Sequence, residues 1–202
     1  MSRHILLAAT ALIFAALSGQ ANADPRKVAS LSAGHESLPP IGWVEFCERH
    51  RDDCDNRRTQ AESMALDEKR WKELVRANTA INAEVEPVTD QEQWGKPEQW
   101  DYPATGKGDC EDYVLEKRKR LMKLGWPRSA LLITVVRDKK GDGHAVLTAR
   151  TDRGDFILDN QVNKILLWTD TGYLFVKRQA PENQNRWLSL GNVDTKPFTA
   201  AR

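Results

Sequence analysis

Three side chains in the second half of the sequence have types and surroundings suited to thiol chemistry, and the first is Cys110. It follows the turn residues Gly108 and Asp109 and opens a run of helical composition, so we expect it in the first turn of a helix. Unpaired amides and the helix dipole at that end favour an anion and lower the pKa of a thiol. Because the same amides can stabilise an oxyanion on an attacked carbonyl group, Cys110 is a candidate nucleophile.

The other two side chains lie on segments predicted to form neighbouring strands. His144 opens the first strand, residues 144–150, directly after a glycine turn, and Asp159 lies near the end of the second, residues 156–160. The residues between them carry the Gly and Asp of a hairpin loop, so the strands should pair with His144 and Asp159 as diagonal neighbours. A thiol, an imidazole that takes and returns its proton, and a carboxylate that orients the imidazole together permit nucleophilic catalysis.

Each residue alone also has an ordinary structural interpretation. A single cysteine on a helix is usually a small buried apolar residue, and a histidine beside a glycine is often only a loop residue. An aspartate at a strand end is often a turn former. The order of the three along the predicted elements, helix then strand then strand, favours the catalytic interpretation.

The predicted elements that position these side chains come with helices first and strands second. Apolar residues at the helical period predict an amphipathic helix over residues 63–83, and a second helix is predicted from Cys110 to Leu124, where Gly125 stops it. Further strands are predicted over residues 130–137, 165–168 and 173–177. Helices followed by an antiparallel sheet indicate an α+β fold.

A loop predicted between the two helices, residues 84–108, carries Trp94, Trp100 and Tyr102. Aromatic side chains in a polar loop often line a cleft, although packing of the loop onto the core is their commoner role. We predict that these residues form walls of a substrate cleft, with core packing as the alternative.

The start of the sequence has the parts of a secretory signal peptide. Basic Arg3 precedes an apolar run from Ile5 to Leu17, and Ala21-Asn22-Ala23 provides the small residues of a cleavage site. The run is shorter than the roughly 20 apolar residues that span a bilayer, which favours cleavage over an uncleaved anchor. The predicted organisation is a signal peptide (1–23), an extended lead-in (24–42), one domain (43–180) and a C-terminal tail (181–202).

Composition excludes some classes of function. Removing the signal peptide takes away Arg3 and no acid, so the 30 basic and 29 acidic residues of the sequence become 29 of each. A neutral chain gives no support for nucleic-acid binding, which usually shows as a basic excess. No second long apolar run follows in the sequence, so we expect no stable membrane insertion after cleavage.

The sequence holds an odd number of cysteines. Cys47 and Cys54 lie close together, and an oxidising compartment favours a local disulfide between them, with two unpaired thiols as the alternative. Cys110 is then left over, and a leftover thiol is either reactive or simply buried.

Three strings around the candidate residues resemble the bacterial transglutaminase-like cysteine proteinases. They are Gly108-Asp109-Cys110-Glu111-Asp112-Tyr113, which is the most specific, Gly143-His144-Ala145-Val146-Leu147 and Leu158-Asp159-Asn160-Gln161. The tryptophan loop and the segment from Cys47 to Cys54 also look like that family. The resemblance implies a papain-like, transglutaminase-like core with N-terminal helices packed on an antiparallel sheet.

The resemblance also implies a function. Cys110, His144 and Asp159 would be the catalytic triad of a periplasmic cysteine endopeptidase that acts on an exported or surface polypeptide. Members of the family clip a large surface adhesin, which makes an adhesin one expected partner.

Acidic residues beside the cysteine raise an electrostatic problem. Asp109, Glu111 and Asp112 place negative charge around a thiol that must ionise, and like charges raise its pKa. A divalent cation would cancel this effect, and carboxylate oxygens suit calcium. Calcium-dependent relatives in the family imply Asp109 and Glu111 as calcium ligands. The alternative is that Asp109 caps the helix and the other two complement its dipole, with no metal.

Two other functions stay open from the sequence. The same triad can transfer an acyl group to an amine instead of water, as a transglutaminase or amidase does. A non-catalytic module that binds calcium or a polypeptide could also keep this fold, although an intact triad argues against it.

Overall fold

The structure of the protein is a computed structural model that describes residues 30–55 and 57–191. The predicted signal peptide, residues 1–23, lies outside the described residues, as does the first part of the predicted lead-in.

Seven strands form one antiparallel sheet in the order β1-β9-β8-β4-β5-β6-β7. Their bounds are β1 (Glu36–Ser37), β4 (Leu131–Arg137), β5 (Gly143–Thr151), β6 (Gly154–Leu158), β7 (Leu166–Leu167), β8 (Leu174–Ala180) and β9 (Asn183–Ser189). A separate parallel pair joins β2 (Glu86–Pro87) to β3 (Lys107–Gly108). β4 and β5 are apolar and almost fully buried, as expected of central strands.

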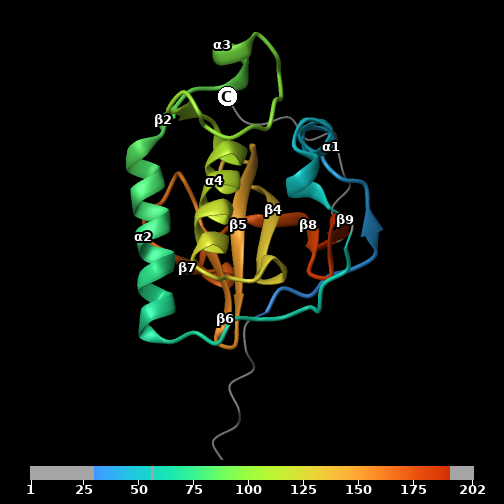
Figure 1. The fold of residues 1–202 in the computed structure, drawn as a ribbon, viewed down its shortest axis with the longest axis vertical. Coiled ribbons are helices and arrows are strands. Elements are labelled where there is room, and N and C mark those ends of the chain that lie inside the picture. The colour runs from blue at the N-terminus through green and yellow to red at the C-terminus, as the bar shows by residue number, and fades with distance from the viewer. Residues whose placement is uncertain (1–29, 56, 192–202) are drawn as a thin grey trace, which may run out of the picture.

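The helices are α1 (Ile41–Arg49), α2 (Glu68–Glu84), α3 (Asp90–Trp94) and α4 (Cys110–Lys123), with short 3-10 segments at η1 (Arg51–Cys54), η2 (Arg128–Ala130) and η3 (Trp168–Asp170). α2 and α4 run side by side over one face of the sheet, with α4 against β5 (Figure 1). The α+β fold predicted from the sequence, with helices packed on an antiparallel sheet, is confirmed.

Local sequence explains where α2 and α4 begin and end. α2 starts after Asp67, whose carboxylate accepts a hydrogen bond from the N–H of Arg70 at 2.7 Å. α4 stops at Gly125, which adopts a left-handed φ of 88° that favours glycine, so the chain turns back towards the sheet at Trp126. Gly125 therefore ends α4, whose first residue is Cys110.

Apolar residues fill both faces of the sheet. On one face, Val114 and Leu121 of α4 pack with Ile133, Ala145 and Leu147 of the central strands. The opposite face holds a smaller cluster of Leu31, Val136, Val146, Ile157 and Phe175. The sheet is therefore covered on both faces by apolar residues.

The predicted helix over residues 63–83 begins later than expected. Residues before Glu68 run along the sheet instead, because Met64 bonds through its backbone to Arg150 at 3.0 Å and to Asp152 at 3.1 Å. The residues after this helix, predicted as an irregular loop, contain the short helix α3. Thr89 and Glu92 form a capping box at its start, a signal that the sequence does carry.

Two strands lie outside the predicted domain bounds of 43–180. β9 lies in the segment predicted as a tail, and β1 lies in the predicted lead-in. β9 was hard to predict because most of its residues are polar. Its Gln184 is nevertheless buried and accepts a hydrogen bond from Arg118 at 2.9 Å, and Trp187 is buried in the core. The sheet therefore needs residues up to Ser189.

Within the described residues, no helix has the length and apolar character that crossing a membrane requires.

Candidate active site

α4 brings Cys110 to the end of the sheet. Asp109 holds the position before the helix, but its side chain does not cap it, so the predicted capping bond is wrong. The Asp109 carboxylate instead accepts a hydrogen bond from the N–H of Asp90 at 3.2 Å. Gly108 lacks a Cβ for a packing reason, because an added Cβ would lie 2.5 Å from the carboxylate of Asp112.

The β5–β6 pairing leaves space for the cysteine at the start of β5. Pairing stops where Leu147 faces Leu158. Farther towards the start of β5, beyond this pairing, the N–H of Ala145 donates to Sγ of Cys110 at 3.4 Å. The sulfur therefore lies against the backbone at the residue that follows His144.

His144 and Asp159 meet as the hairpin predicts. Asp159 follows β6 directly, and its Oδ1 lies 2.9 Å from Nε2 of His144, with both side chains buried. The N–H of Gln161 donates to the same oxygen at 2.9 Å, and the hydroxyl of Tyr173 donates to Oδ2 at 2.5 Å. Asn82 of α2 donates to the Asp159 carbonyl oxygen at 2.8 Å, so both the backbone and the side chain of this residue are held.

These contacts keep Asp159 ionised. Burial raises the pKa of the carboxyl group, but the hydrogen bonds and positive charge of His144 and the bonds from Tyr173 and Gln161 outweigh burial and lower it. An ionised carboxylate on Nε2 favours the neutral imidazole tautomer that carries its proton there, which leaves Nδ1 as the free base.

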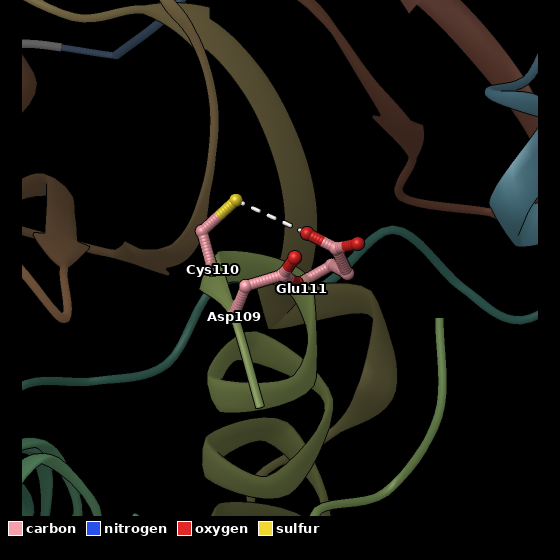
Figure 2. Close-up of side chains that lie close together, drawn as sticks. All are labelled: Asp109, Cys110 and Glu111. Carbon is pink, nitrogen blue, oxygen red and sulfur yellow. Dashed lines mark hydrogen bonds between the residues drawn. The ribbon is translucent and has the colours of Figure 1, made fainter. Parts of the chain in front are cut away.

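The thiol of Cys110 takes a different partner from the one predicted. It donates to Oε2 of Glu111 at 3.1 Å, as Figure 2 shows, and no hydrogen bond joins it to His144 within the described part of the chain. The predicted row of carboxylate, imidazole and thiol is therefore formed only between Asp159 and His144. Burial raises the pKa of the Cys110 thiol well above its usual value, and the negative charges of Glu111 and Asp109 raise it further.

Carboxylates are concentrated around this thiol. Asp109 and Glu111 each offer an oxygen within 4.8 Å of the other and of Sγ, and Asp90 and Asp112 form an equally close group with Asp109. Burial, then the charge of Asp109, raises the pKa of Asp90 to about 7. Burial also raises the pKa of Asp112 to about 9 and that of Glu111 well above its ordinary range. So many buried acids strongly disfavour their own ionisation.

The donor set fits a hard cation. One oxygen each of Asp90, Asp109 and Glu111 is buried without a hydrogen-bond partner among the described residues. Buried polar atoms in native proteins normally have partners, and carboxylate oxygens are the ligands that calcium prefers. Asp90 and Asp112 therefore join Asp109 and Glu111, which the sequence predicted, as candidate ligands.

The three aromatic residues predicted to line a cleft lie in different environments. Trp100 is wholly buried between Trp43 and Trp187, at ring distances of 6.3 and 6.5 Å, so its prediction as a cleft wall is wrong and core packing is its role. Tyr102 lies against Phe46 and lines a hollow over the far part of α4. Trp94 is 43% exposed on α3, and its role in a cleft stays a prediction.

The cysteines divide as predicted. Cys47 of α1 and Cys54 of η1 form a disulfide with a Cα–Cα distance of 5.4 Å, and Cys110 is a free buried thiol.

Two parts of the site escaped sequence analysis. Tyr173 was predicted only as the start of a strand, because nothing in its neighbours marks it as a partner of Asp159. Asp90 lies 19 residues before Asp109, and only the β2–β3 pair and α3 bring the two together.

Comparison with known proteins identifies the family of the chain. Residues 33–195 match the family model of the bacterial transglutaminase-like cysteine proteinases. The chain belongs to this family. The bacterial transglutaminase-like cysteine proteinases are cysteine peptidases, so the protein is assigned to that enzyme class. No match was found among the curated proteins.

Solved structures of the same kind include LapG of Legionella pneumophila. The chain is 27% identical to it, with a TM-score of 0.51, over 60% of this chain and 70% of LapG. A calcium-bound structure of LapG from the same organism is 24% identical over 63% of this chain and 74% of that one, with a TM-score of 0.52, and shows the shared fold.

Proposed function

We propose that this bacterial transglutaminase-like cysteine proteinase is an exported endopeptidase with Cys110 as nucleophile, His144 as base and Asp159 as the residue that orients the imidazole. The observation that carries the proposal is the 2.9 Å contact of His144 Nε2 with Asp159, next to the backbone amide that holds Sγ at 3.4 Å. A carboxylate on Nε2 leaves Nδ1 to exchange a proton with the thiol.

This geometry supports acyl transfer in two stages. The Cys110 thiol gives its proton to Nδ1 of His144, and the thiolate attacks the peptide carbonyl carbon. The N–H of Cys110, at the N-terminus of α4, stabilises the oxyanion that forms. The imidazolium then protonates the departing amine, and a thioester of Cys110 remains. In the second stage His144 takes a proton from a water molecule, which attacks the thioester and releases the acid and the thiol.

The thiol has to leave Glu111 before it can reach His144. Its present bond to Oε2 of Glu111 directs the proton away from the imidazole, and burial, followed by the charges of Glu111 and Asp109, raises the pKa of the thiol. Withdrawing the Glu111 carboxylate from the sulfur frees the thiol proton and removes one of the charges that raise the thiol pKa, and a cation bound by the acids would favour this change.

Calcium is the cation that this proposal assigns, with Asp109 and Glu111 as ligands and Asp90 and Asp112 as further ones. When bound, calcium supplies positive charge that offsets the acids around Cys110. Support comes from the buried oxygens without partners and from the calcium-bound structure of the relative LapG.

Calcium binding is tested by calorimetric titration of the chelator-treated protein. The expected result is saturable binding that weakens roughly tenfold or more in Glu111→Gln and Asp109→Asn, because each change removes a charged ligand. Glu68→Gln is the matched control, since Glu68 is an exposed acid on α2 that pairs with Lys72, and its affinity should equal that of the wild type. A wild-type protein that takes up no calcium would rule the ion out.

Export to the periplasm is part of the proposal. The predicted signal peptide supports it, and so does the Cys47–Cys54 disulfide, because disulfides persist in oxidising compartments. The substrate is then an exported or surface polypeptide, for which a surface adhesin is the candidate that the family suggests.

A peptide mixture incubated with the purified protein and a labelled amine tests the reaction. Hydrolysis gives new free termini, and we expect both Cys110→Ala and His144→Gln to abolish them while the fold is kept. Products that carry the amine would instead indicate the transglutaminase alternative. Cleavage that persists in Cys110→Ala contradicts the proposal, and a wild type that yields no product favours the binding module.

A further inference from the structure

Tyr173 touches both residues that are proposed to activate the thiol. It lies immediately before β8, where Gly172 takes a left-handed φ of 71° and Thr171 accepts a hydrogen bond from the Tyr173 N–H at 3.2 Å. Its hydroxyl donates to Oδ2 of Asp159 at 2.5 Å. Its ring lies edge-on to the imidazole of His144, with centroids 5.9 Å apart and planes at 83°. The residue before β8 thus contacts both members of the His144–Asp159 pair.

The two oxygens of Asp159 are divided between different donors. Oδ1 meets His144 and the N–H of Gln161, and Oδ2 accepts from Tyr173. A carboxylate held at one oxygen can rotate about its Cβ–Cγ bond, whereas one held at both has a fixed plane. The hydroxyl also draws charge towards Oδ2 and so limits how strongly Oδ1 attracts an imidazolium.

We propose that Tyr173 is a positioning residue for this site: its hydroxyl fixes the Asp159 carboxylate and its ring fixes the imidazole, so that Nδ1 of His144 faces Cys110. The inference rests on the proposed function for its catalytic meaning, but the contacts themselves do not depend on it. Tyr173 acts through Asp159 and His144 and needs no contact with substrate.

Other charged groups surround this pair and stay constant in the test. Asp138, in the turn between β4 and β5, acts on both Tyr173 and His144, Asp109 acts on His144, and Lys117 of α4 acts on Asp159. Burial raises the pKa of Tyr173, and the hydrogen bond to Asp159 and its charge raise it further. The phenol therefore remains a hydrogen-bond donor over the pH range of a histidine titration.

The test compares Tyr173→Phe with Tyr102→Phe, each made in the full chain with Cys110→Ala so that thiol ionisation does not contribute. Tyr102 is the matched control because its hydroxyl also donates to an aspartate, Oδ2 of Asp53 at 3.1 Å, away from the site. The readout is the pKa of His144 from NMR titration of its imidazole, identified with His144→Gln, in chelator-containing buffer.

Tyr173→Phe should raise the pKa of His144 by roughly one unit, a tenfold gain in proton affinity, because Asp159 then offers its whole charge to the imidazole. Tyr102→Phe should leave it unchanged. A His144 pKa equal to or below that of the parent in Tyr173→Phe overturns the inference.

A second substitution guards against a variant that does not fold. 3-Fluorotyrosine at position 173 has a more acidic hydroxyl and should donate more strongly, so it should lower the pKa of His144; an unchanged or higher value contradicts the inference. Failure of the proposed function would appear separately, as loss of peptide cleavage by the protein with intact Cys110.

Discussion

Lys117 is the most unusual single residue outside the active site. Its side chain is fully buried on α4, about two turns after Cys110, and its Nζ has no hydrogen-bond partner among the described residues. Nζ lies 5.6 Å from the centroid of the Tyr113 ring, and the charge of Asp159 also acts on it. Burial lowers the pKa of Lys117 to about 7, although Asp159 partly opposes the shift.

The shift makes stability depend on pH in a defined direction. Between pH 7 and the usual lysine pKa of about 10.4 the unfolded chain binds the proton and the folded one does not, so stability rises with pH. Lys117→Met removes this penalty and should stabilise the protein at pH 7 by a few kcal/mol, on the order of the shift itself.

Urea unfolding at pH 7 and pH 10 measures the effect. The advantage of Lys117→Met over the wild type should shrink at pH 10, because the unfolded lysine then also loses part of its proton and the penalty for deprotonation on folding becomes small. Lys69→Met, at an exposed position on α2, is the control and should show no such trend. An advantage of equal size at both values of pH would mean that Lys117 is not buried in its neutral form.

β9 is the element whose importance is least visible in the sequence. Trp187 projects from it into a group of rings, 6.5 Å from the centroids of both Trp43 and Trp100, and is wholly buried. This contact ties the last strand to α1 and to the loop before α4. The integrity of the sheet thus depends on a segment that follows the last predicted strand.

Trp187→Ala should therefore cost about 3–5 kcal/mol of unfolding free energy, as expected for a large buried aromatic side chain. The comparison is Trp94→Ala on α3, where the side chain is 43% exposed and the loss should be well under half of that. Denaturant titration of both variants measures the two losses. Equal free energies of unfolding for Trp187→Ala and Trp94→Ala would contradict a core role for Trp187.

The sequence predicted elements well where local signals are strong and poorly where tertiary contacts decide. α4 begins at Cys110 as expected and ends at Lys123 rather than Leu124, because glycine turns flank it. The start of α2 was wrong because pairing of Met64 with the sheet overrides its helical spacing. The partners of Asp159 followed from the hairpin only for His144, since Tyr173 comes from a different strand.

At the scale of the whole molecule, the start of α4 lies against the start of β5, at the end of the β5–β6 hairpin opposite its turn. Cys110, His144 and a group of buried acids lie there. The fold positions the imidazole and the carboxylate already in this state. The Cys110 thiol donates to Glu111, and burial and the neighbouring acids raise its pKa, which favours the protonated form. Activity should therefore depend on conditions that offset the negative charge of the acids around the sulfur.

The most direct test of the central claim is identification of new polypeptide termini among proteins released by cells that make either the wild type or Cys110→Ala. Mass spectrometry of terminal peptides gives both the substrate and the cleaved bond. We predict at least one terminus that appears only with the wild type and is also lost with His144→Gln. Identical sets of termini for the wild type and Cys110→Ala would contradict the assignment of Cys110 as the nucleophile of an endopeptidase.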